Sequence, residues 1–134
     1  MDLPLSLKLD AAFLQSLLGY NARRASLAII EQFHVDMASF DLRPVDFSVL
    51  SLIRHNPGTT SRQLCQALNI LPPNMVVFLK NFEKRQLVDR APHPSDGRAM
   101  GLTLTESGEA LIQAAENTAI DSGLKATSLL TKSE

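Results

Sequence analysis

The chain has 134 residues and is 45% hydrophobic, which excludes a disordered chain and leaves room for one globular domain with a buried core. Its single cysteine excludes an internal disulfide, and no apolar run approaches the roughly 20 residues that span a bilayer. Residues 1–4 lack the pattern of a secretory signal, so we expect a soluble, cytoplasmic protein that contacts no membrane.

The net charge of −1 hides an uneven distribution of charge along the chain. Residues 54–98 carry seven basic and three acidic side chains, a net charge of +4. The remainder carries six basic and eleven acidic side chains, a net charge of −5. A basic middle between acidic flanks suits a protein that presents one surface to phosphate groups.

The first expected element is one long amphipathic helix that begins at Asp10, a candidate N-cap, and ends near Phe40. Apolar residues recur three or four positions apart along this segment, and no proline interrupts it. The expected length is more than twice the roughly 11–12 residues of an average helix. We therefore expect another helix or a second subunit to cover its apolar stripe.

Three shorter helices are expected next. The first spans about 44–55, with Pro44 in its first turn, and the turn residues 56–58 end it. Thr60 and Gln63 form a capping box for the second, which stops near residue 70. The expected inward residues of this second helix are Leu64, Cys65, Ala67 and Leu68. A third helix opens at Pro72-Pro73 and runs to about Arg85.

After this helix the apolar period changes from 3.6 to 2, which predicts strands over 87–91 and 100–104. The segment between them contains Asp96-Gly97, a hairpin-turn signal. Thr105 is the expected cap of a last helix, with Glu106 in its first turn. That helix carries the apolar residues Ala110, Leu111, Ala114, Ala115, Ala119 and Leu124.

A short helix, a turn, a second helix and a two-stranded hairpin in this order predict a winged helix-turn-helix. We therefore expect a mostly α fold with a small β-hairpin wing (α+β). On the second helix, one narrow sector holds the expected core residues Met75, Phe78, Leu79 and Phe82. The outer face of this recognition helix is polar and basic, which suits the major groove of DNA. Its predicted DNA-binding residues are Pro73, Asn74, Val77, Lys80, Asn81 and Lys84.

The hairpin tip offers a second contact with DNA. We expect His93, Ser95, Asp96 and Arg98 to form this wing, with the arginine in the narrow minor groove. Asp96 would pair with Arg98 or with Arg90; alternatively, Asp96-Gly97 is only a tight turn and Arg98 a solvated side chain. Thr60, Ser61 and Arg62 are expected to contact the DNA backbone.

From Leu42 to Leu111 the chain resembles the MarR (multiple antibiotic resistance regulator) family of bacterial transcription factors. The most specific matching element is Asp96-Gly97-Arg98 followed by Leu-Thr-x-x-Gly at 104–108. Other matching segments are 42–50, 63–68 and 82–90.

The resemblance implies a homodimer in which helices over 1–40 and 105–134 interleave, the latter expected to be incomplete, around a DNA-binding lobe over 41–104. All three parts are expected to form one structural domain. The dimer would read a pseudo-palindromic double-stranded operator, as a repressor that a small aromatic or phenolic effector releases. Arg24 and His34, on the long helix, are candidates for the effector pocket.

Two positions depart from the family pattern. Val76 and Val77 stand where similar proteins usually carry Ser or Thr and then Arg; two valines cannot donate hydrogen bonds to bases, though they could contact thymine methyl groups. Gln86 replaces the usual glycine after the recognition helix, which predicts a strained backbone there.

Enzyme and metal-site patterns are absent from the sequence. There is no Gly-rich phosphate loop, nucleophile elbow or catalytic carboxylate pair, and His34, His55 and His93 lack metal-ligand spacing. We expect no enzyme activity, no metal and no cofactor, and we interpret Cys65 as a structural thiol. Two alternatives stay open: a winged helix used for protein–protein assembly, and a small-molecule-binding protein that has lost DNA binding.

Overall fold

The computed structural model describes residues 9–92, 95 and 99–132, with side chains as far as residue 125. The chain divides into two compact units, Met1–Gln32 and Phe33–Glu134. Within the described ranges, no helix combines the length and the apolar character needed to cross a membrane.

The expected continuous helix over 10–40 is wrong, because the structure has a short helix α1 (Ala12–Gln15) followed by a separate helix α2 (Leu18–Met37). Polar side chains at the break compete with the helical backbone bonds. The Ser16 hydroxyl donates to the carbonyl of Phe13 at 2.6 Å, and the Asn21 amide donates to the carbonyl of Gln15 at 2.8 Å. Asp10 does help to start α1, since its carboxylate accepts from the backbone amide of Ala12 at 2.9 Å.

At its other end α2 tightens into one 3-10 turn, η2 (Ala38–Phe40), and Asp41 then takes a left-handed conformation with φ 52°. The guanidinium of Arg85 holds this turn, donating to the carbonyls of Phe40 and Asp41 at 3.0 Å each. The rings of Phe33 and Phe47 meet edge to face at 5.4 Å, so the last turns of α2 pack on the helix that follows.

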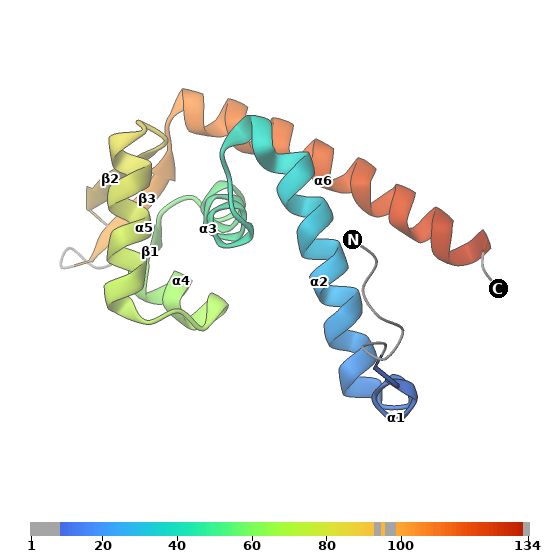
Figure 1. Cartoon of the computed structure of the whole chain (residues 1–134). Helices are drawn as coiled ribbons and strands as arrows, with labels where there is room; N and C mark the ends of the chain where they lie inside the picture. Colours follow the sequence, from blue (N-terminus) through green and yellow to red (C-terminus); the bar gives the residue numbers. More distant parts are fainter. Residues whose placement is uncertain (1–8, 93–94, 96–98, 133–134) are drawn as a thin grey trace, which may run out of the picture. The chain divides into compact units, whose positions relative to one another are not determined.

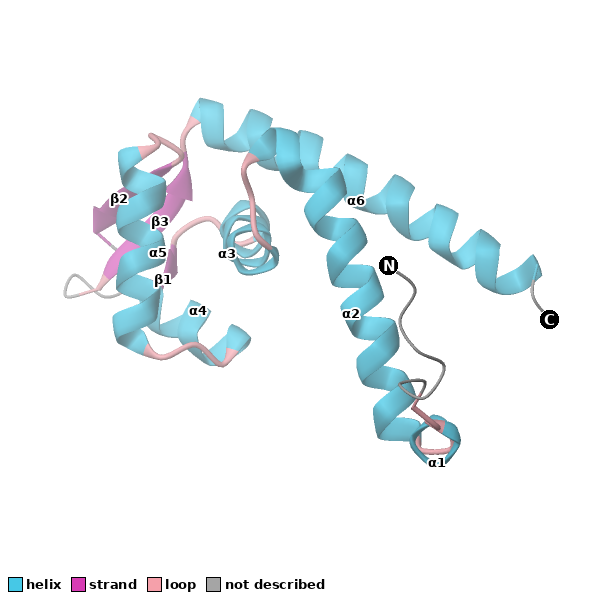
Figure 2. Cartoon of the chain, viewed as in Figure 1, coloured by secondary structure: helices cyan, strands magenta, loops and turns pink. Residues whose placement is uncertain are grey.

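The remaining elements form a winged helix-turn-helix lobe, as the sequence predicts (Figures 1 and 2). Pro44, Thr60, Pro72 and Thr105 stand at helix starts where capping and proline rules place them. In chain order the elements are α3 (Pro44–His55), β1 (Thr59–Thr60), α4 (Ser61–Leu68), α5 (Pro72–Lys84), β2 (Val88–Pro92), β3 (Met100–Leu104) and α6 (Glu106–Lys132).

The wing sheet has three strands rather than the expected two. β3 lies in the middle and pairs antiparallel with β2, with Arg90 opposite Leu102, and with β1, with Thr60 opposite Gly101. Glycine at position 101 permits this close pairing, because a Cβ atom there would lie 3.0 Å from the carbonyl oxygen of Gly58 and the neighbouring backbone would have to shift. A two-residue strand is too short for a period-2 pattern, so only its pairing with β3 reveals it.

The core of the lobe lies between α3, α5, the sheet and the first half of α6. It includes the predicted Met75, Leu79 and Phe82, and its fully buried large side chains are Phe82, Met37, Leu50, Ile53, Leu64, Met75, Leu79, Leu102, Ile112 and Val49. On α6 the buried stripe follows Gly108, Ile112 and Ala115 at intervals of three and four residues. On α4 the expected inward residue Ala67 is exposed instead, because it stands off the buried stripe of its helix. On α6 the apolar residues Ala110, Ala114 and Leu124 are exposed.

The junction between α5 and β2 confirms the strained backbone expected at Gln86, which has φ 58°. The following turn is tightly held. Thr105 donates its hydroxyl to the carbonyl of Gln86 at 2.6 Å and its amide to the carbonyl of Leu87 at 3.0 Å. The turn also abuts Gly108, where a Cβ atom would lie only 2.1 Å from the Leu87 carbonyl oxygen.

Candidate nucleic-acid interface

The helix-turn-helix is built from α4 and α5, and local chemistry fixes both ends of α4. The predicted capping box is present. The backbone amide of Gln63 donates to the Thr60 hydroxyl at 3.2 Å, and the side-chain oxygen of Gln63 accepts from the backbone amide of Thr60 at 2.9 Å. Asn69 ends α4 in a left-handed conformation with φ 54°, and Pro72 then opens α5. The turn is therefore defined on both sides before any tertiary contact is made.

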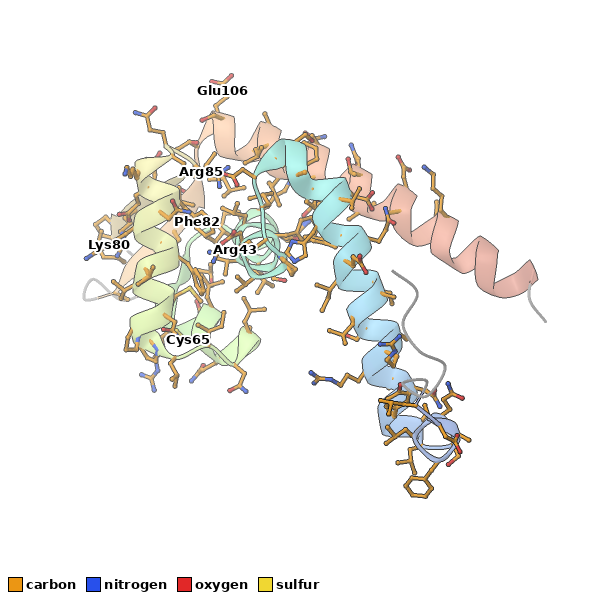
Figure 3. The ribbon with its side chains drawn as sticks, viewed as in Figure 1. Arg43, Cys65, Lys80, Phe82, Arg85 and Glu106 are labelled. Atoms are coloured by element: carbon orange, nitrogen blue, oxygen red, sulfur yellow. The ribbon has the colours of Figure 1, made fainter. Side chains whose placement is uncertain are left out.

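The inner face of α5 anchors it to the lobe. Met75, Leu79 and Phe82 are fully buried, and Figure 3 shows Phe82 turned inward while Lys80 points away from the core. Phe78 is half-buried, and the guanidinium carbon of Arg43 lies 5.5 Å from the centre of its ring. This contact ties the start of α3 to the middle of α5.

Arg43 is held in place by its own helix. Its guanidinium makes two hydrogen bonds, of 3.0 and 3.1 Å, with the carboxylate of Asp46, which is buried and also accepts from the Arg43 backbone amide at 3.0 Å. The hydrogen bond with Asp46 and its negative charge raise the pKa of Arg43. The cation that stacks on α5 therefore stays charged and in one geometry.

The outer face of α5 is exposed along its whole length, and all the predicted recognition residues lie there. Pro73, Asn74, Val77, Lys80, Asn81 and Lys84 are each exposed. Within the described residues neither Lys80 nor Lys84 has an ion-pair partner. The two ammonium groups are available for an anion, and the Asn81 amide is available for hydrogen bonds.

Several basic side chains of residues 54–98 already have partners within the chain, so they are not available to an anion. Arg54 binds Glu109 and Glu116, and Arg90 contacts Glu83. Arg85 donates to the carbonyls at the end of η2 and just after it. Arg62, Lys80 and Lys84 are exposed and lack an ion-pair partner in the part of the chain that the structure describes. Among the described basic residues of 54–98, the available positive charge therefore lies on α4 and on the outer face of α5.

The predicted backbone-contact residues divide into two kinds. Arg62 is exposed, whereas Thr60 and Ser61 are half-buried, and the Thr60 hydroxyl already serves the capping box. Of the predicted wing residues, Ser95 is exposed, and His93, Asp96 and Arg98 lie outside the described residues. Cys65 is half-buried and packs against the core, in keeping with a structural thiol.

A polar network that the sequence did not indicate joins α3 to α6. One oxygen of the Glu116 carboxylate accepts from the Ser51 hydroxyl at 2.7 Å and lies 2.9 Å from Nε2 of His55, and the other contacts the Arg54 guanidinium. The second nitrogen contact of Arg54 is with Glu109, at 2.6 Å. Partial burial opposes the charge of Glu116, but these hydrogen bonds outweigh it and lower its pKa. The network positions the lobe on α6.

The two candidates for an effector pocket are exposed and belong to different units: Arg24 lies in Met1–Gln32 and His34 in Phe33–Glu134. Their role in effector binding stays a prediction.

Comparison with known proteins relates most of the chain to bacterial regulators. The MarR family model matches residues 40–99. The transcriptional repressor CouR, solved with a 23-mer DNA duplex, is 37% identical over 94% of this chain and 89% of that one, with a TM-score of 0.85. CouR bound to p-coumaroyl-CoA is 35% identical over 92% and 85% of the two chains, with a TM-score of 0.78.

A more distant relative is the HTH-type transcriptional repressor Rv2887 of Mycobacterium tuberculosis. It is 28% identical over 99 residues, which span 74% of this chain and 71% of the relative. Its structure with salicylic acid is 25% identical over 82% of each chain, with a TM-score of 0.65.

Proposed function

Since the chain belongs to the MarR family of transcriptional regulators, we propose that it represses transcription by binding a pseudo-palindromic operator as a homodimer, and that a small aromatic effector releases it. The observation that carries this proposal is the two-sided character of α5. One face is buried in the core, and the other presents Lys80, Asn81 and Lys84 without ion-pair partners among the described residues. Such a helix fits a major groove, where lysines meet phosphate or guanine and an asparagine reads adenine.

The wing would supply a second contact. Arg98 belongs to the sequence motif Asp96-Gly97-Arg98, which resembles MarR proteins, and a narrow minor groove attracts an arginine through its negative potential. Two recognition helices related by a dimer axis would then enter successive major grooves, roughly 34 Å apart, with a wing beside each.

Homodimer formation is supported by the apolar side chains that a single chain leaves in water. Large hydrophobic residues at both ends of the chain are exposed, among them Leu18 at 86% and Phe13 at 76%. A second copy would cover such surface in a self-complementary interface. The large exposed apolar residues that the structure describes on α1, α2 and α6 are Phe13, Leu14, Leu18, Leu27, Ile29, Ile30, Val35, Ile120 and Leu124.

The effector class rests on the relatives. CouR is solved with p-coumaroyl-CoA and Rv2887 with salicylic acid, so both bind a ligand that combines an aromatic ring with negative charge. In this chain the guanidinium of Arg24 would pair with a carboxylate or phosphate of such a ligand. The effector would lower operator affinity only to the extent that it binds the released state more tightly.

The test is fluorescence anisotropy of a labelled duplex from the region upstream of the protein's own gene, titrated at several salt concentrations against a scrambled duplex. We expect tight, salt-sensitive binding that prefers the native duplex. The double variant Lys80→Ala/Lys84→Ala should reduce the salt slope by about 1.8, since each phosphate contact contributes about 0.9. The variant Lys125→Ala, which removes an exposed lysine from α6, is the matched control and should leave the slope unchanged.

A second candidate function is protein–protein assembly, which the exposure of Val76 and Val77, 44% and 64%, favours. Equal and weak binding to both duplexes, with no change in the double lysine variant, would support that function and refute ours.

A second experiment tests the effector class. When p-coumaroyl-CoA or salicylate is added to the preformed complex with DNA, we expect release of the labelled duplex.

A further inference from the structure

The outer face of α5 contains an apolar side chain where its charges would favour another polar one. Core residues on this helix cluster around one direction, and at roughly 100° per residue Val77 lies about 30° from the centre of the opposite face. Val76 lies about 70° from that centre, near the edge. Exposure follows the same order, 64% for Val77 and 44% for Val76.

Val77 is flanked by groups that define its partner. Lys80 and Lys84 lie on the same face one and two turns away, and neither has an ion-pair partner within the described residues. The nearby acidic side chain, Glu83, is half-buried and contacts Arg90. A partner for this face must therefore combine dense negative charge with a small apolar group at the position of Val77.

Duplex DNA meets both conditions at one place. Phosphates line the major groove, and the thymine C5-methyl is the apolar group that an unmodified base pair presents there. A valine offers two methyl groups and neither a donor nor an acceptor, so it discriminates between bases by burying a methyl group and by leaving polar base edges unpaired. A protein partner with a matching apolar spot would also need acidic groups beside it, opposite Lys80 and Lys84.

We propose that Val77 is a specificity-determining residue that selects a thymine in each half-site of the operator through contact with its methyl group. This inference rests on the proposed function, because it requires the outer face of α5 to lie in the major groove. Val76, at the edge of the face, makes the smaller contribution.

The test separates the methyl group from everything else in the base pair. A duplex is first selected from a random-sequence pool by the full chain at fixed salt. Each thymine is then replaced in turn by deoxyuridine, which keeps the base pairing and removes only the methyl group. We expect one position in each half-site at which the replacement weakens binding about fourfold, the equivalent of about 0.8 kcal/mol for one buried methyl group at 1.4 kcal/mol per tenfold.

The same duplexes are titrated with three variants. Val77→Ala should bind thymine and deoxyuridine duplexes equally at that position, and Val77→Thr, which keeps one methyl group, should retain part of the preference. Lys84→Ala should weaken binding to every duplex and keep the fourfold ratio. Because Val77 is mostly exposed and alanine favours helix, the alanine variant should keep its fold, which circular dichroism verifies.

The outcomes distinguish the two proposals. A deoxyuridine effect that is present in the wild type and absent in Val77→Ala supports the inference. Binding that tolerates deoxyuridine at every position, or an equal effect in both proteins, overturns the inference and leaves the proposed function standing. Failure of any sequence to be enriched from the pool overturns both.

Discussion

Replacement of Glu116 by glutamine tests the polar network between α3 and α6. The wild-type carboxylate accepts from Ser51 at 2.7 Å, lies 2.9 Å from His55 and contacts Arg54. Glutamine keeps the shape of the side chain but retains one acceptor oxygen, and its amide group would be a donor facing other donors. The side chain is only 15% exposed, so water cannot fully replace the lost acceptor.

The expected loss of stability follows from these contacts. A hydrogen bond to a charged group contributes roughly 1.5–3 kcal/mol, and screening by solvent at the rim of the site reduces the sum. We expect Glu116→Gln to destabilise the protein by about 2 kcal/mol. For a chain of this length that corresponds to a decrease in Tm of about 5–10 °C.

The pH dependence has a definite sign. The folded protein lowers the pKa of Glu116 below its ordinary value of 4.5, so the ionised network stabilises the folded state above that pH. As the pH falls through the ordinary value and then through the lowered one, the carboxylate is protonated and this contribution is lost. The difference in Tm between wild type and variant should therefore shrink below pH 4.5.

Thermal unfolding followed by circular dichroism, at one protein concentration between pH 7 and pH 3, measures this difference; the fixed concentration matters because dimerisation would make Tm concentration-dependent. Glu109→Gln is the matched control. That side chain is 48% exposed and, among the described residues, is paired with Arg54 alone, so the Tm of this variant should change by a few degrees at most. Equal Tm values for wild type and Glu116→Gln at pH 7, or a difference that does not change with pH, would refute the reasoning.

Two further substitutions test the junction after α5. Gln86→Gly should raise Tm by about 2–5 °C, because glycine relieves a left-handed strain of roughly 1–2 kcal/mol, partly offset by the greater entropy of the unfolded chain. Asn69→Gly is the control: at φ 54° its Tm should rise less, since asparagine tolerates that conformation. An equal rise in Tm for both variants would contradict this explanation. Gly108→Ala should lower stability by more than about 3 kcal/mol or prevent folding, because its Cβ would lie 2.1 Å from the Leu87 carbonyl oxygen. Gly19→Ala, with open space around its Cβ, is the control and should be neutral or stabilising; urea unfolding measures both, and a folded, fully stable Gly108→Ala would show the close approach to be wrong.

Local signals in the sequence were sufficient for most of the lobe. The capping box at Thr60, the prolines at 44 and 72 and the switch to a period of 2 near residue 88 each act over a few neighbouring residues, so they mark element ends before any tertiary contact forms. The same holds for the two faces of α5, whose division into a core side and an outer side depends only on the helical period. The strain at Gln86 is predicted because glutamine stands where the family pattern has a glycine.

The sequence by itself thus determined the recognition helix, the side that it turns outward, and the order of the elements from α3 to α6 except β1. Only the tertiary structure decided which basic side chains of residues 54–98 are available to a partner. Arg54 and Arg90 contribute to the basic segment in a simple count, yet the first is paired with Glu109 and Glu116 and the second with Glu83. The partners of Arg54 lie 55 and 62 residues away along the chain. Ion pairing depends on distance in space, which the local periodicity of a sequence does not encode. Capping and helical faces depend on distance along the chain, which the local periodicity does encode.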